Sequence, residues 1–163
     1  MTLAAGVLLT LGLQAAEEIT IRKMTNGEYS AHGVGGMRSM NDGDHYMMIG
    51  GGGTCLVRYA FKTGEVVDTL FDVKSARGCD FKRFDGYIMS PAEDRILIQT
   101  KTNYIYRRSF TAEYYIYDVK NRKMAPLSTG GPQQVPSFSP DGKMIAFVRD
   151  NNLHLVKLLF DNS

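Results

Sequence analysis

The stretch SPAEDRILI, residues Ser90–Ile98, recurs 49 residues later as SPDGKMIAFV, residues Ser139–Val148. A weaker copy, SMNDGDHY, stands 51 residues before the first, at Ser39–Tyr46. In each copy a Ser-Pro or Asp-Gly turn precedes an apolar strand, because proline presets φ for a turn and glycine tolerates a positive φ. Three copies at nearly equal spacing indicate a structural repeat.

A second strand is expected in each repeat, followed or preceded by polar turn residues. The expected second strands are Cys55–Phe61, Tyr114–Val119 and Leu153–Leu158, and the turns are 62–65, 120–123 and 149–152. No helical periodicity is found after the first residues, so the pattern predicts an all-β fold. Repeats of about 40 to 50 residues with several strands each are typical of β-propeller blades. A stacked sandwich is the rival, but it requires no phrase repeated at a fixed distance.

The number of repeats is small for a propeller. Closed propellers contain about four to eight blades, whereas this chain has residues for about three. Three blades leave sheet edges open, which is unfavourable for an independent domain. We therefore expect residues 17–163 to be an incomplete N-terminal propeller domain, the front portion of a longer protein.

Composition is that of a soluble globular protein. Of 163 residues, 44% are hydrophobic and 22% are charged, and the net charge is +2. This near balance lacks the basic surface that nucleic-acid binding requires, so nucleic acid is not expected as a partner.

The first sixteen residues differ in kind from the rest. Leu3–Leu13 is an almost unbroken apolar run with small residues after it, too short to span a bilayer but suited to a signal peptide. No lysine or arginine precedes the run, and a buried strand or short helix is the alternative. We interpret residues 1–16 as a signal peptide, which predicts export to the periplasm or cell envelope.

An arginine pair, Arg107 and Arg108, interrupts the aromatic stretch YIYRRSFTAEYYIYD of Tyr104–Asp118. The pair is expected on an exposed loop that enters a strand, where recognition residues are common. Arginine presents a planar fork of donors that suits carboxylates and carbonyl oxygens. A solvated or salt-bridged loop is the plainer interpretation of the pair. The neighbouring aromatic residues are expected to pack within a blade, namely Tyr104, Tyr106, Phe110, Tyr114, Tyr115 and Tyr117.

Other chemistry-bearing residues give weaker signals. There is no Gly-x-Ser-x-Gly motif, and the histidines lack a nucleophile context or paired metal spacing, so we expect no catalytic residue, metal or cofactor. The glycine run 50–53 is interpreted as a hairpin connection, and the Asp-Gly pairs as turns. Cys55 and Cys79 either pair or remain separate thiols. The three histidines without a nucleophile context or paired metal spacing are His32, His45 and His154.

From about Ile19 to its end the chain resembles the N-terminal β-propeller of the dipeptidyl peptidase IV family, serine peptidases of the prolyl oligopeptidase type. The Ser-Pro-Asp-Gly phrase is common to many propellers, whereas YRRSFTAEY is much more particular. The resemblance is carried by KTGEVV (62–67), GYIMSP (86–91), YRRSFTAEY (106–114) and PQQVPSFSPDG (132–142).

The resemblance implies that Arg107 reaches a central cavity and orients a peptide substrate, with Arg108 at a variable position. It also implies a glutamate pair beyond Ser163 that holds the substrate's amino terminus. The catalytic serine, aspartate and histidine would belong to a C-terminal α/β-hydrolase domain that this sequence does not contain, so the chain alone should be inactive.

The full protein would then release N-terminal dipeptides with proline or alanine second, and a homodimer is its expected assembly. The alternative is a non-enzymatic periplasmic propeller that binds a protein or peptide. The coding sequence after Ser163 separates the two.

Overall fold

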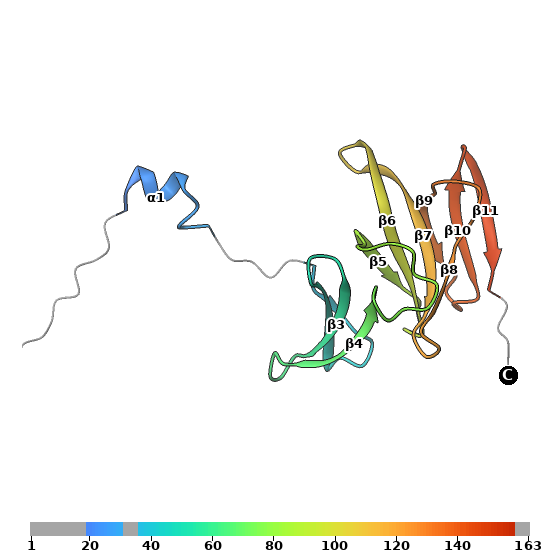
Figure 1. Cartoon of the computed structure of the whole chain (residues 1–163), viewed down its shortest axis with the longest axis horizontal. Helices are drawn as coiled ribbons and strands as arrows, with labels where there is room; N and C mark the ends of the chain where they lie inside the picture. Colours follow the sequence, from blue (N-terminus) through green and yellow to red (C-terminus); the bar gives the residue numbers. More distant parts are fainter. Residues whose placement is uncertain (1–18, 31–35, 159–163) are drawn as a thin grey trace, which may run out of the picture. The chain divides into compact units, whose positions relative to one another are not determined.

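The computed structural model describes residues 19–30 and 36–158, drawn in colour in Figure 1. The chain divides into two compact units, Met1–Val34 and Gly35–Ser163. The predicted leader 1–16 and His32 lie outside the described residues.

In the first unit the described residues contain one short helix, α1 (Ile21–Thr25). The Thr20 side chain caps it by accepting a hydrogen bond from the Lys23 backbone N–H at 3.3 Å. This helix departs from the expectation that no helix follows the leader. Five residues are too few to produce a visible helical period in the sequence.

The described part of the second unit consists of three antiparallel sheets (Figure 1). In each sheet, strands that follow one another in sequence are neighbours in space, as expected of propeller blades. The all-β prediction is confirmed. The first sheet contains β1 (Arg38–Ser39), β2 (His45–Gly50), β3 (Cys55–Ala60) and β4 (Val66–Asp72); the second β5 (Gly86–Met89), β6 (Arg95–Tyr106), β7 (Ser109–Asp118) and β8 (Lys123–Pro126); the third β9 (Gln134–Phe138), β10 (Met144–Arg149) and β11 (Asn152–Lys157).

The repeated phrase forms the same turn in all three sheets. Each turn leads from the first strand of its sheet to the second. The turns begin at Met40, Ser90 and Ser139, and three residues after each of these the backbone has a positive φ. The φ values are 75° at Gly43, 57° at Glu93 and 68° at Gly142. These positions are 50 and 49 residues apart, so the first step is one residue shorter than the sequence comparison suggested. A backbone N–H closes each turn on a carbonyl five residues ahead, at 2.9, 2.9 and 2.8 Å, in the pairs Met40–His45, Ser90–Arg95 and Ser139–Met144.

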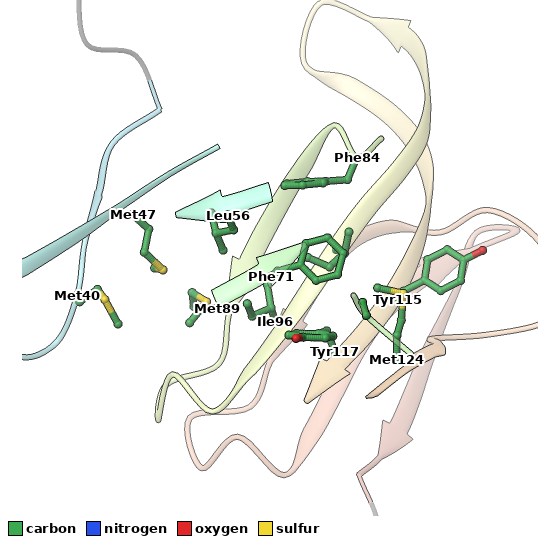
Figure 2. Packing of buried hydrophobic residues seen from close by; sticks show 12 residues of the cluster. Met40, Met47, Leu56, Phe71, Phe84, Met89, Ile96, Tyr115, Tyr117 and Met124 are labelled. Carbon is green, nitrogen blue, oxygen red and sulfur yellow. The ribbon is translucent and has the colours of Figure 1, made fainter. Parts of the chain in front are cut away.

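The first and second sheets share a hydrophobic core, shown in Figure 2. Phe71 of β4 packs edge-on against Tyr117 of β7, with ring centroids 4.9 Å apart and planes 77° apart. Met47 of β2 and Ile96 of β6 are fully buried in the same cluster. The sheets therefore stack face to face, as the blade interpretation requires.

A second core lies between the second and third sheets. It joins Leu97 and Tyr114 of the second sheet to Ile145 and Phe147 of β10, all at most 2% exposed. Because successive strand residues point to opposite faces, Ile96 and Leu97 serve the two cores on either side of the second sheet. The second sheet is thus covered on both faces.

The outer face of the third sheet carries apolar side chains that no described residue covers. Leu155 pairs with Ala146, and Leu153 with Val148, on the face opposite Ile145 and Phe147. Leu153 is 70% exposed and Leu155 is 64% exposed. No helix among the described residues is long and apolar enough to cross a membrane.

Candidate functional site: an arginine-tipped arm

The middle repeat departs from the other two in the length of its central hairpin. The second strand of the middle sheet, β6, has twelve residues, whereas its equivalents β2 and β10 have six each. The next strand, β7, has ten residues, whereas its equivalents β3 and β11 have six each. β5 pairs with β6 only as far as Gln99, and β8 pairs with β7 only from Tyr115 onward. The remaining residues form a two-stranded arm that projects past its sheet (Figure 1).

The base of the arm is a strand irregularity held by side chains. The register of β6 against β7 shifts between Thr100 and Asn103, and Lys101 has a left-handed φ of 50°. Asp85 Oδ2 accepts hydrogen bonds from the Thr102 backbone N–H at 3.0 Å and from its hydroxyl at 2.8 Å. These contacts fix the direction in which the arm leaves the sheet.

A surface ion pair braces the same base across the two strands. Lys101 Nζ lies 2.7 Å from Glu113 Oε2. The hydrogen bond and negative charge of Glu113 raise the pKa of Lys101, which therefore stays protonated. Both groups are accessible to solvent, so the pair contributes little to stability and serves mainly to orient the strands.

Arg107 and Arg108 are the two turn residues at the tip of the arm, between the paired Tyr106 and Ser109. The prediction that they occupy an exposed loop entering a strand is confirmed. Both side chains are exposed, and neither forms an ion pair or hydrogen bond within residues 19–30 and 36–158. The salt-bridged alternative therefore has no support in the described residues, and both guanidinium groups are free to receive a ligand.

The aromatic residues of the stretch divide into two groups. Tyr114, Tyr115 and Tyr117 are at most 7% exposed, so packing within the blade is confirmed for them. It is wrong for Tyr104 and Tyr106, which are 72% and 76% exposed, because β6 has no neighbour other than β7 at those positions. The Tyr104 ring leans on Phe110 across the arm, with centroids 5.8 Å apart.

On the β7 side the arm is anchored by Gln133, a residue that the sequence interpretation missed. Gln133 is 1% exposed, and its side-chain oxygen accepts a hydrogen bond from the Tyr114 backbone N–H at 3.0 Å. Its backbone also exchanges two hydrogen bonds with Ala112, at 2.7 and 3.0 Å. Burial of the Tyr114 side chain raises the pKa of its phenol to about 12.

A cleft of about 520 Å³ opens at the foot of the arm. One wall comes from the turn between β2 and β3, and the other from the segment before β5 and from β6. Sequence analysis did not find it, because its residues come from three separate stretches. The lining residues are Ile49, Gly52, Gly53, Arg83, Phe84, Asp85, Thr102 and Tyr104.

The remaining candidates lie elsewhere and have structural roles. His45 begins β2 and bonds Asp42 at 2.7 Å, which lowers the pKa of that carboxyl, while His154 of β11 stacks on Phe147 at 5.2 Å. Asp42 and Asp141 accept backbone N–H bonds inside their turns, as expected.

The two cysteines, Cys55 and Cys79, are free thiols in the structure, so the unpaired alternative holds. The glycine run, interpreted as a hairpin connection, does join β2 to β3. In the described residues no three His, Cys, Asp or Glu side chains gather as a metal site would require.

Comparison with known proteins supports the resemblance. The family described as the dipeptidyl peptidase IV N-terminal region matches residues 90–163, which include the whole arm. A probable dipeptidyl-aminopeptidase B of Aspergillus niger is 40% identical over 72 residues, covering 42% of this chain and 8% of that protein. A second, from Aspergillus fumigatus, is 24% identical over 98% of this chain and 19% of its own length.

The crystal structure of Porphyromonas gingivalis dipeptidyl peptidase 4 is similar over most of the chain. It is 39% identical, with a TM-score of 0.74, and the similarity covers 90% of this chain and 22% of that one. The chain thus spans less than a quarter of the length of each of these relatives. Residues 90–163 thus match a dipeptidyl peptidase IV N-terminal region, and the three blade-like antiparallel sheets match part of the propeller of that dipeptidyl peptidase 4.

Proposed function

We propose that the chain is the N-terminal, non-catalytic propeller portion of an exported serine dipeptidyl peptidase, and that Arg107 orients the peptide substrate. The observation that carries the proposal is the projecting arm, which ends in two unpaired arginines and lies within the family match at residues 90–163. In the full enzyme a serine of an α/β-hydrolase domain attacks the substrate carbonyl. The products are N-terminal dipeptides with proline or alanine second.

Arg107 suits this role for physical reasons. Its guanidinium can donate two parallel hydrogen bonds to a carbonyl or carboxylate, and such charge-assisted bonds are stronger than neutral ones. The rigid base of the arm, held by Asp85 and Gln133, limits the positions that the tip can reach. Fixing a donor before the substrate arrives lowers the entropy lost on binding, which is how positioning accelerates a reaction.

Arg108 occupies the next turn position and is equally exposed. We assign it a lesser role, because adjacent turn residues direct their side chains differently and the resemblance matches only Arg107 to the substrate contact. The proposal also includes export through the leader 1–16 and access of substrates through the propeller. A peptide is the expected ligand, and a homodimer is the expected assembly of the full enzyme.

The test compares two arginine variants of the full-length gene product, which is expressed from the complete reading frame, including any codons after Ser163. Substrates are dipeptides with proline or alanine second, joined to a chromogenic amine. Loss of a charge-assisted hydrogen bond predicts that Arg107→Ala lowers kcat/KM about 10- to 100-fold, whereas Arg108→Ala lowers it less than about threefold.

Both variants should unfold at the wild-type temperature, because neither side chain has a partner in the described residues. Equal effects of the two substitutions would contradict the assignment of Arg107. A full-length product that cleaves none of these substrates, and whose coding sequence lacks a hydrolase domain, would refute the peptidase and favour the non-enzymatic binding propeller.

A further inference from the structure

The cleft at the foot of the arm has walls that are fixed independently of any ligand. The Phe84 backbone N–H donates to the Gly53 carbonyl at 2.8 Å, which joins the two sides, and the Phe84 ring is 3% exposed. The Asp85 N–H donates to the Gln99 carbonyl at 2.8 Å. A ligand therefore meets a preformed site and loses little free energy in ordering it.

The cleft also carries a positive group without a partner. Arg83 lines it and forms no ion pair or hydrogen bond with any residue that the structure describes. Its Nε lies 3.7 Å from where a β-carbon of Gly53 would be, so the guanidinium lies along the glycine backbone. The nearby Asp85 forms no ion pair with Arg83 in the described residues, and its Oδ2 accepts the two donors of Thr102.

Two exposed apolar side chains also line the cleft, beside the Asp85 carboxylate, the Thr102 side chain and the backbone of Gly52 and Gly53. Ile49 is 37% exposed and Tyr104 is 72% exposed, on opposite sides of the opening. A ligand that places a carboxylate at Arg83 and an apolar stem against Ile49 or Tyr104 uses these groups. Arginine binds carboxylates through two parallel N–H···O bonds, which favours a carboxylate over a neutral amide.

The position of the cleft relates it to Arg107. Tyr104 lies three residues before Arg107 on the same arm, and three residues of extended chain span about 10 Å. A peptide held at the tip and running along the arm therefore reaches the cleft within about three or four of its own residues.

We infer that this cleft is a second peptide-binding subsite, in which Arg83 binds an acidic side chain or terminal carboxylate of the substrate beyond the residues oriented by Arg107. This inference rests on the proposed function. It makes the propeller a determinant of which longer peptides are preferred, in addition to its role in orienting their amino-terminal residues.

The experiment uses the full-length gene product and six-residue peptides with proline second. Each peptide carries one glutamate, placed in turn at residues three to six, and is compared with the same peptide carrying glutamine there. The readout is the ratio of kcat/KM for the glutamate peptide to that for the glutamine peptide. An exposed arginine–carboxylate pair predicts a ratio of about five at one position, falling to about one in Arg83→Gln.

Lys82→Gln is the matched control, since it removes the same charge from an exposed neighbour that does not line the cleft. A ratio that is unchanged in Arg83→Gln, or that falls equally in Lys82→Gln, would overturn the subsite. Failure of the proposed function is seen separately, as no cleavage of a chromogenic dipeptide derivative by the wild-type protein, and the subsite then falls with it.

Discussion

Replacing Asp85 should loosen the arm without touching its tip. One oxygen of this carboxylate holds both the backbone N–H and the hydroxyl of Thr102, next to the left-handed Lys101. Asp85→Ala removes both hydrogen bonds, whereas Asp85→Asn keeps the shape and one acceptor but removes the charge. The arm should open more often in both variants, and more in the alanine variant.

The magnitude follows from the two hydrogen bonds. Bonds to a charged group contribute about 1.5–3 kcal/mol each when buried, but Asp85 is exposed, so we take about 2 kcal/mol for the pair. This corresponds to about a 30-fold increase in the population of the open arm. For Asp85→Asn about half that free energy, and about a fivefold increase, is expected.

Amide hydrogen exchange on the full chain measures this opening directly. Protection of the amides between Asn103 and Phe110 should fall by these factors, while that of β2 and β3 stays unchanged. Asp68→Asn is the control, because it breaks the ion pair of Asp68 with Arg58 on the first sheet at 2.6 Å and leaves the arm alone. Unaltered protection of the arm in Asp85→Ala would refute the role of the carboxylate as its clamp.

Three further predictions concern the scaffold. Leu97→Ala should lower the free energy of unfolding by about 3 kcal/mol, because Leu97 is fully buried between two sheets. Leu155→Ala on the open face should change it by less than about 0.5 kcal/mol. Denaturant titration measures both values, and equal losses would contradict the stacking. Gly53→Ala should be more destabilising than Gly52→Ala in the same titration, because both glycines have positive φ but only the new methyl at position 53 meets the Phe84 carbonyl, at 2.7 Å. Burial raises the pKa of Tyr114 to about 12, so Tyr114 in the unfolded chain loses its proton at lower pH than in the folded protein. The free energy of unfolding should therefore fall as pH rises from about 10 to about 12. In Tyr114→Phe this part of the decline should disappear from melting curves recorded across that pH range.

The repeat, the strands and the arginine turn were predictable because they depend on local chemistry. Ser-Pro and Asp-Gly favour turns through their own backbone preferences, and the turn at Arg107 lies between two segments with the alternation of strands. The exposure of Tyr104 and Tyr106 was not predictable, because the same alternation continues into the buried Tyr114 and Tyr117. What separates the two groups is whether a neighbouring strand is present, which no local pattern encodes.

The clamp and the cleft were hidden for a related reason. Asp85 and Thr102 are 17 residues apart, and Gln133 lies 19 residues from Tyr114. Their meeting depends on the register of one strand against another and on a bulge at Lys101, so the identity of the residues alone gives no signal. Arg83 likewise owes its place in the cleft to the Gly53 turn, which is distant in the sequence.

The location of the arginines follows from the way the blades are built. Within a stacked sheet both faces of a strand are covered, so a charged side chain there would lose its hydration without gaining a partner. The extra residues of β6 and β7 carry the chain past its neighbours, where arginine stays hydrated until a ligand arrives. Such an extension would be mobile without support. Two residues outside the hairpin supply it, because Asp85 holds β6 at Thr102 and Gln133 holds β7 at Tyr114. Substitution of either should therefore change how the arm presents Arg107 to a peptide, although neither residue lies at the tip.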